Sequence, residues 1–267
     1  MAISAEVLVN SIGPCQIRLV TFKLVYPRFI HSELMTHRSF SRNAASSRAI
    51  PIEKFRDRVL KNTAIPIFWG KNKSGMQAIE EIEDIDKANK WWLNSMHDAI
   101  RRHREGQALG LHKQVLNRIL EPFMHMETIV TADNQSLEHF YKLRIHKDAQ
   151  PEFFALAKAM LNSDNSSNIN ELREGEWHLP FIRDEDKSLS VENLLKISVG
   201  RCARISYLNH EGYRDLDKDI ELHDKLKNSV PGHWSPFEHV AMALKRKERI
   251  GNFIGWKQYR KFFPNES

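Results

Sequence analysis

The chain has 267 residues, enough for one large domain or two small ones with a buried core. Its 41% hydrophobic and 28% charged residues are typical of a soluble globular protein. No apolar run approaches the roughly 18 residues that a membrane helix needs. The formal net charge of +6 favours anionic ligands, but the basic residues are scattered. This argues against a dedicated nucleic-acid binder, which concentrates its basic residues on one face or arm.

The two cysteines, Cys15 and Cys202, belong to no Cys-x-x-Cys pair, and the chain has no His-Glu-x-x-His sequence. A zinc site of the usual spacing is therefore not expected. Few cysteines are typical of a reducing compartment. The first six residues lack the basic and apolar regions of an export signal, so we expect a cytoplasmic protein.

Hydrophobic periodicity and helix-ending residues predict an α+β protein in which helices dominate. Pro27 ends the first strand, and Ser136 is the expected N-cap of one helix. The predicted elements, in chain order, are a strand at 16–26, a helix at 29–36, a polar run at 37–48, helices at 52–62, 85–104, 111–121, 136–144 and 151–161, a candidate linker at 163–168, helices at 191–198 and 216–228, and a strand at 237–244.

The polar run at 37–48 is the most informative segment. It holds three arginines, one histidine, four serines and one asparagine, and no apolar period runs through it. Arginines supply bidentate donors to phosphate, and small residues let the backbone approach an anion closely. The run contains no glycine, so it is neither a Walker A loop nor a dinucleotide fingerprint. It predicts a phosphate or nucleotide site, with a solvated surface loop as the alternative.

Two further features bear on chemistry. Arg118 and Arg144 lie among core-like residues of two predicted helices, which suits an anion between those helices. For each arginine alone, a surface position is the alternative. His233 and His239 flank a carboxylate, Glu238, but their spacing across a proline does not favour a metal site.

Four blocks of the chain resemble the flavin-dependent thymidylate synthase family. Residues 37–48 resemble its signature Arg-His-Arg-x-x-Ser-x-Asn-x-x-Ser-x-Arg, through His37-Arg38, Ser41, Asn43, Ser46 and Arg48. Residues 117–150 are similar to the second conserved half of the family. Residues 201–207 and 232–239 resemble segments that precede the signature in ordinary members. We therefore expect a circularly permuted member.

The resemblance implies a helix-rich α+β single domain, residues 1–267, with a small antiparallel sheet. Within it we expect a signature-bearing part at 1–162, a junction at 163–190 and a permuted segment at 191–267. Pro14–Gln16 stands where the family has Pro-Phe-Glu, and Pro236–Glu238 matches that element better. Whether Gln16 or Glu238 occupies the flavin-side position stays open.

The resemblance also implies the reaction, its cofactors and its site. The implied reaction is FAD-dependent methylation of dUMP to dTMP, with methylenetetrahydrofolate and NADPH as co-substrates, in a homotetramer with shared active sites and no membrane or nucleic-acid partner. The implied FAD contacts are His37, Asn43, Ser206, His233, Ser235 and Glu238. The implied substrate contacts are Arg38, Ser46, Ser47, Arg48, Arg118 and Arg144. Of these, Arg144 and Ser46 are the catalytic candidates, and Arg144 is expected at the uracil ring.

Three positions depart from the signature. Thr36 replaces its first arginine, Ala44 its usual acidic residue and Ala49 its usual aromatic residue. Arg42 is a candidate to restore the charge that is missing at Thr36. Because these changes surround the nucleotide, a pyrimidine hydroxymethyltransferase on the same scaffold is the alternative enzyme. A non-catalytic nucleic-acid-binding protein is the alternative from another class.

Overall fold

A computed structural model describes residues 3–207, 215–264 and 266. Its main sheet has the strand order β3-β4-β2-β1-β5, all antiparallel except the β1–β5 pair. A second sheet has the order β10-β7-β6, and β8 pairs with β9. The strands are β1 (Ser4–Ile12), β2 (Arg18–Pro27), β3 (Ser41–Ala44), β4 (His125–Asp133), β5 (Asn170–Glu171), β6 (Trp177–His178), β7 (Ala241–Ala243), β8 (Arg249–Ile250), β9 (Phe253–Ile254) and β10 (Trp256–Gln258).

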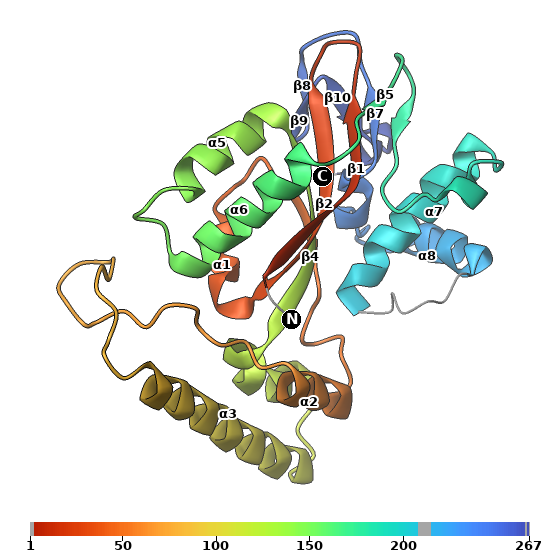
Figure 1. Ribbon diagram of the computed structural model, residues 1–267. Coiled ribbons are helices and arrows are strands. Elements are labelled where there is room, and N and C mark those ends of the chain that lie inside the picture. Colours follow the sequence, from red (N-terminus) through yellow and green to blue (C-terminus); the bar gives the residue numbers. More distant parts are fainter. Residues whose placement is uncertain (1–2, 208–214, 265, 267) are drawn as a thin grey trace.

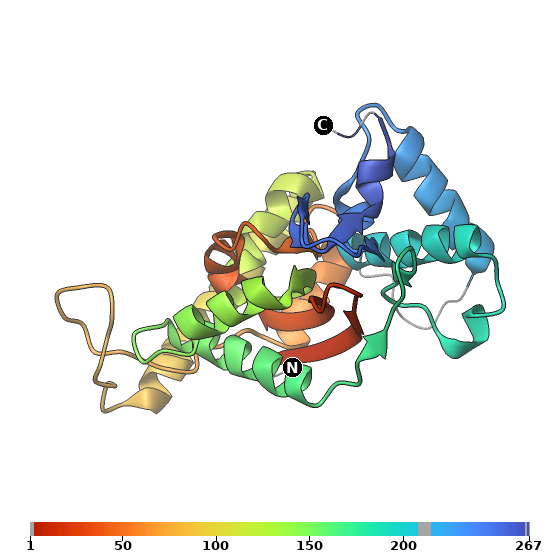
Figure 2. The same ribbon diagram turned by 90° about the horizontal axis from the view of Figure 1, so that it is seen from above.

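The helices cover both faces of the main sheet. In Figure 1, α5 and α6 lie on one side of the sheet, and the paired helices α7 and α8 lie on the other. Residues 70–81 are exposed and belong to a loop that extends away from the body before α3 (Figure 2). The α-helices are α1 (His31–Met35), α2 (Ile52–Lys61), α3 (Ile85–Ala108), α4 (Lys113–Leu116), α5 (Asn134–Arg144), α6 (Pro151–Asn165), α7 (Val191–Arg204) and α8 (Leu216–Asn228). The 3-10 helices are Arg28–Ile30, Asn117–Phe123, Asp184–Asp186, Ile205–Tyr207, Ser235–Glu238 and Tyr259–Phe262.

The main core lies between the sheet and the helices α1, α2, α3, α5 and α6. The central strand β2 alternates its side chains between two buried faces, so that Phe22 and Leu24 join this core while Leu19 joins a second cluster. In that second cluster, Leu19 packs with Ala243 and Trp256. The second cluster brings the two ends of the chain together beside the main sheet.

Most predicted elements are present, and several of their boundaries differ. The helix predicted at 191–198 continues to Arg204, and the one predicted at 111–121 is a short α-helix followed by a 3-10 helix through Pro122. The segment predicted as a strand at 237–244 begins as a 3-10 helix, and only Ala241–Ala243 is a strand. The N-cap expected at Ser136 is Asp133, whose carboxylate accepts from the Ser136 N–H. Asp133 is the N-cap because its side chain reaches the free backbone amides of the first helical turn.

Four segments depart further from the predictions. β1 and β4 were not predicted, and part of the polar run forms the edge strand β3. An edge strand is held by backbone hydrogen bonds to one neighbour, so it needs no apolar period. The candidate linker at 163–168 is tied to the sheet, because Asp164 is buried and lies 2.8 Å from Arg18. Within the described residues, no helix is long and apolar enough to cross a membrane.

Candidate active site

The polar run is ordered by the polar groups of the protein itself. The Ser41 hydroxyl oxygen accepts hydrogen bonds of 2.9 Å from both Asn252 and Gln258. The Asn43 amide donates to the carbonyl oxygen of Cys202 at 2.8 Å. Because these partners come from the last third of the chain, the C-terminal segment and α7 form one wall of the run.

His37 and Arg144 meet at the start of the run. The Nε–H of Arg144 donates to Nε2 of His37 at 3.0 Å, and its Nη2 donates to the Thr36 hydroxyl at 3.2 Å. The Arg144 guanidinium also lies 4.7 Å from the centre of the Phe153 ring. Burial, followed by the charge of Arg144, lowers the pKa of His37 to about 4. His37 is therefore neutral at pH 7 and accepts through Nε2.

Arg42 closes the C-terminal end of α1. Its Nη1 lies 3.4, 3.1 and 2.9 Å from the carbonyl oxygens of Leu34, Met35 and His37, at the end of the helix and just beyond it. The charge of Arg42 is thus held next to Thr36, where the signature has its first arginine.

Arg42 also lines a cavity of about 450 Å³ between the run and the C-terminal segment. Three of its lining residues, Arg38, Arg42 and Arg260, are arginines, and its only carboxylate is Glu238. Glu238 is bonded to Arg260 at 2.9 Å. Arg260 also lies 3.3 Å from Glu266, which is not part of the lining. Within the lining itself three cations face one anion, which makes this cavity suitable for a phosphate or another anion. The other lining residues are His31, Met35, Phe40, Ala44 and Asn252.

Two phosphate candidates, Ser47 and Arg118, converge on Glu121. The Ser47 hydroxyl donates to Glu121 at 2.6 Å, and Arg118 donates to the same oxygen at 3.4 Å. Arg28 lies 3.8 Å from the other carboxylate oxygen. Glu121 therefore holds these donors together, and an incoming phosphate would compete with it. The sequence reasoning gave Glu121 no role, although it belongs to the family-like block at 117–122.

The remaining candidates fall into two groups. Ser206 meets the run, since its hydroxyl donates to Asn43 Oδ1 at 3.2 Å and its carbonyl accepts from the Ser46 N–H at 3.2 Å. Arg48, His233 and Ser235 are exposed, and none of them lines the arginine cavity. The structure thus brings Ser46 and Ser206 together and leaves these three at the surface.

Sequence reasoning missed two supporting groups. Asn117 is fully buried and donates to the carbonyl oxygens of Ser47 and Ile50 at 2.8 and 3.0 Å, which fixes the end of the run. Arg260 reaches the cavity from the C-terminal segment. Asn117 belongs to a family-like block, whereas no local pattern distinguishes Arg260 from a surface arginine. Among the described residues, no group of three or more His, Cys, Asp or Glu side chains is arranged to hold a metal ion.

No curated protein matches the chain in sequence. Among solved structures, the UMP/dUMP methylase PolB from Streptomyces cacaoi, bound with 5-Br dUMP, matches with a TM-score of 0.50. It is 14% identical and covers 60% of this chain and 89% of that chain, so the likeness bears on the fold alone.

A family model extends the comparison to sequence. It spans the signature and the block at 117–150, whereas 201–207 and 232–239 lie outside it. Because the model described as "Thymidylate synthase complementing protein" matches residues 13–164, more than half of the chain, the protein belongs to this family.

Proposed function

We propose that the protein methylates dUMP to dTMP, with methylenetetrahydrofolate as carbon donor, NADPH as reductant and FAD as cofactor. The observation that carries the proposal is the pairing of Arg144 with neutral His37 inside the region that matches the family. The solved relative is titled a UMP/dUMP methylase, which supports a pyrimidine nucleotide as substrate.

The arginine cavity fits the phosphate groups of a flavin dinucleotide. Its three guanidinium groups are donors of the kind that bind phosphate oxygens. His37, Asn43, Ser206, His233, Ser235 and Glu238 are the residues that would hold FAD. When bound and reduced by NADPH, FAD would supply the hydride that reduces the transferred carbon.

The residues of this chain contribute positioning and electrostatics. C5 of uracil becomes nucleophilic as negative charge develops on the ring oxygens. Arg144 donates its Nε–H to His37 and one Nη2 hydrogen to Thr36. Its Nη1 has no hydrogen-bond partner among the described residues. That Nη1 group is therefore free to donate to a uracil oxygen and stabilise the developing charge. Arg118, Ser46, Ser47 and Arg48 would bind the phosphate, and Arg38 would contribute charge nearby.

We further propose that the chain is circularly permuted and forms a homotetramer with shared sites. The contacts of Ser206 with the run and the place of Glu238 in the arginine cavity support the first proposal. Light scattering coupled to size exclusion tests the second, since a mass other than four chains contradicts it.

Two measurements test the proposed reaction. We expect the purified protein to be yellow and to release FAD on denaturation; a colourless protein that FAD cannot reconstitute contradicts both enzyme hypotheses. The second is mass analysis of the nucleotide after incubation with dUMP, methylenetetrahydrofolate and NADPH. We expect dTMP. Hydroxymethyl-dUMP, or consumption of dCMP but not dUMP, would instead favour the hydroxymethyltransferase alternative.

A further inference from the structure

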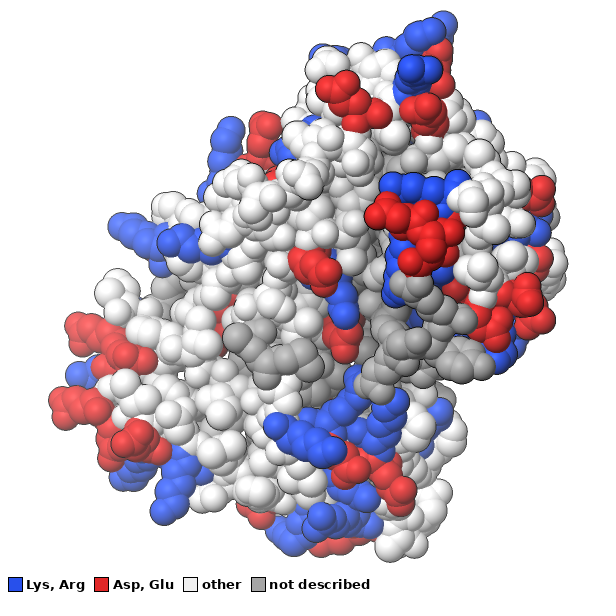
Figure 3. Space-filling view, turned by 45° about the vertical axis from the view of Figure 1, so that its right-hand side comes forward, with Lys and Arg blue, Asp and Glu red and all other residues white. Residues whose placement is uncertain are grey.

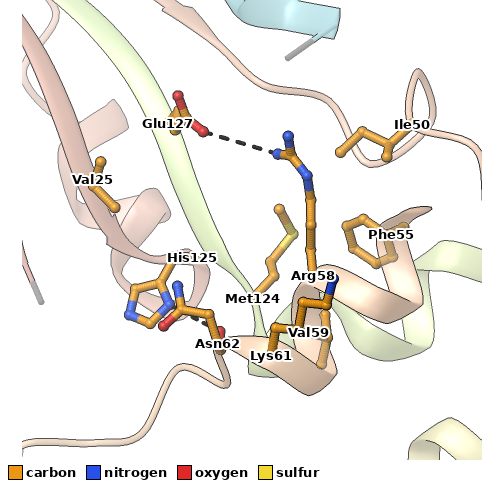
Figure 4. A pocket seen from close by; sticks show the side chains of 10 residues that line it. All are labelled: Val25, Ile50, Phe55, Arg58, Val59, Lys61, Asn62, Met124, His125 and Glu127. Atoms are coloured by element: carbon orange, nitrogen blue, oxygen red, sulfur yellow. Dashed lines mark hydrogen bonds and ion pairs between the residues drawn. The ribbon is translucent and has the colours of Figure 1, made fainter. Parts of the chain in front are cut away.

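A second cavity, of about 280 Å³, lies between α2 and the strands β2 and β4 (Figure 4). It shares no lining residue with the arginine cavity. Five of its ten lining residues are apolar and almost completely buried, and they come from four separate parts of the chain. These apolar residues are Val25, Ile50, Phe55, Val59 and Met124.

The size and walls of this cavity suit a compact ring. An apolar cavity of about 150 Å³ is known to bind benzene, so a cavity of about 280 Å³ has room for a bicyclic ring. Phe55 offers an aromatic ligand a ring contact that is favourable beyond the burial of apolar area. Met124 adds a favourable contact between its sulfur and the ring. An aliphatic chain of equal area lacks both contributions.

The lining also contains charged groups, and its two cations, Arg58 and Lys61, outnumber its one carboxylate, Glu127. Arg58 lies 3.9 Å from Glu127, as the dashed line in Figure 4 shows, and Lys23 lies 3.5 Å from the same carboxylate. Lys61, exposed in the last turn of α2, has no carboxylate partner in the described parts of the chain. An anionic group on the ligand would complete this arrangement.

His125 adds a hydrogen-bond acceptor to the lining. Its Nδ1 lies 3.3 Å from the carbonyl oxygen of Asn62, which can only accept, so Nδ1 carries the proton. Burial lowers the pKa of His125, so the ring is neutral at pH 7. Its Nε2 is then an acceptor and offers no second positive charge. The lining therefore favours a monoanion.

We propose that this cavity binds a small aromatic monocarboxylate, with its ring among Phe55, Val59 and Met124 and its carboxylate at Lys61. The site is separate from the nucleotide site and does not depend on the proposed function. Two of its lining residues border the polar run: the Glu127 carbonyl oxygen accepts from the Ala45 N–H at 2.9 Å, and the Ile50 carbonyl oxygen accepts from Asn117.

The test uses 1-naphthoate as the probe, 1-naphthalenemethanol as its uncharged counterpart and octanoate as an aliphatic carboxylate. Binding to the full chain is followed by calorimetry and by the ¹³C-methyl signal of Met124, assigned with Met124→Leu. We expect one equivalent of 1-naphthoate to bind and to shift this signal. We expect both comparison compounds to bind more weakly. Equal binding of the alcohol or of octanoate contradicts the proposed ligand class.

Two variants locate the site. Lys61→Gln should weaken 1-naphthoate about fivefold, the upper range for an exposed ion pair, and leave the alcohol unchanged. Lys54→Gln, exposed on the same helix, is the matched control and should change neither affinity. Val59→Phe should fill the cavity and abolish binding of 1-naphthoate. If Val59→Phe does not fold, the effect of Lys61→Gln alone tests whether the probe binds in this cavity.

Three further results would overturn the proposal. They are the absence of a Met124 shift at saturating probe, equal effects of the two lysine substitutions, and displacement of 1-naphthoate by dUMP. The last would make the cavity part of the nucleotide site.

Discussion

The Nε–H of Arg144 donates to Nε2 of His37 across 3.0 Å and joins the end of α5 to the turn before β3. This hydrogen bond fixes the tautomer of His37 and the plane of the Arg144 guanidinium. Phe153 supports the same guanidinium from its other side. An arginine held in this way is already oriented before a substrate arrives, which is what electrostatic catalysis requires.

Replacing Arg144 should remove catalysis and preserve cofactor binding. We expect Arg144→Ala to lower kcat about 10²- to 10³-fold, as loss of one donor to a developing oxyanion does in other enzymes. FAD released on denaturation should stay at the level of the unaltered protein. Lys142→Ala, exposed on the same helix, is the control and should leave kcat unchanged. Retained turnover in Arg144→Ala would refute its assigned role.

Arg118 should act on the phosphate and not on the ring. We expect Arg118→Gln to raise KM for dUMP about tenfold with little change in kcat, since a hydrogen bond to a charged group contributes about 1.5–3 kcal/mol. Affinity for deoxyuridine, which lacks the phosphate, should not change. Arg102→Gln, exposed on α3, is the control. If dUMP and deoxyuridine lose affinity equally, Arg118 does not bind the phosphate.

Acid should destabilise the protein through its buried histidines. Burial lowers the pKa of His178 and of His239 to about 3, and that of His37 to about 4. Between pH 6.5 and these values the unfolded chain binds more protons than the folded one. The stabilising contribution of these histidines is therefore fully present above about pH 6.5. Below that pH the free energy of unfolding falls, by up to about 1.4 kcal/mol per pH unit for each fully buried histidine.

Urea unfolding at several pH values between 7 and 4 checks this dependence. His178→Gln should flatten the profile. His97→Gln, exposed on α3, should leave it as in the unaltered protein. A midpoint that does not move between pH 6.5 and 4.5 would contradict the assignment.

A buried ion-pair network should stabilise the helix pair α7–α8. Asp219 is buried and accepts from the Nε–H groups of Arg201 and Arg204, and Asp186 accepts from the same Arg201. Asp219→Asn leaves the two guanidinium groups without this carboxylate, which we expect to cost about 3 kcal/mol of unfolding free energy. Asp217 is exposed on the same helix, so Asp217→Asn is the control and should lower the free energy of unfolding only slightly. Equal unfolding midpoints for the two variants would show that the network does not stabilise the fold.

Prediction from the sequence worked best where the signal was local. The helix at 85–104 carries its own apolar stripe and was predicted close to its bounds, and α6 likewise. β1 and β4 were missed, because strands gain their stability from partners distant in sequence. β3 was missed for a related reason, since its polar side chains are bonded to Cys202, Asn252 and Gln258.

The sequence alone determined the family and the α+β class, because the two blocks at 37–48 and 117–150 combine particular residue types at fixed spacings, and both lie within the family match. It also marked 37–48 as the segment that matters. Only the tertiary structure decided which groups meet there: His37 with Arg144, Asn43 with Ser206, and Arg38 with Arg260 in one cavity. Such pairs are set by how sheet and helices pack, and side chains more than a hundred residues apart leave no local pattern that would reveal them.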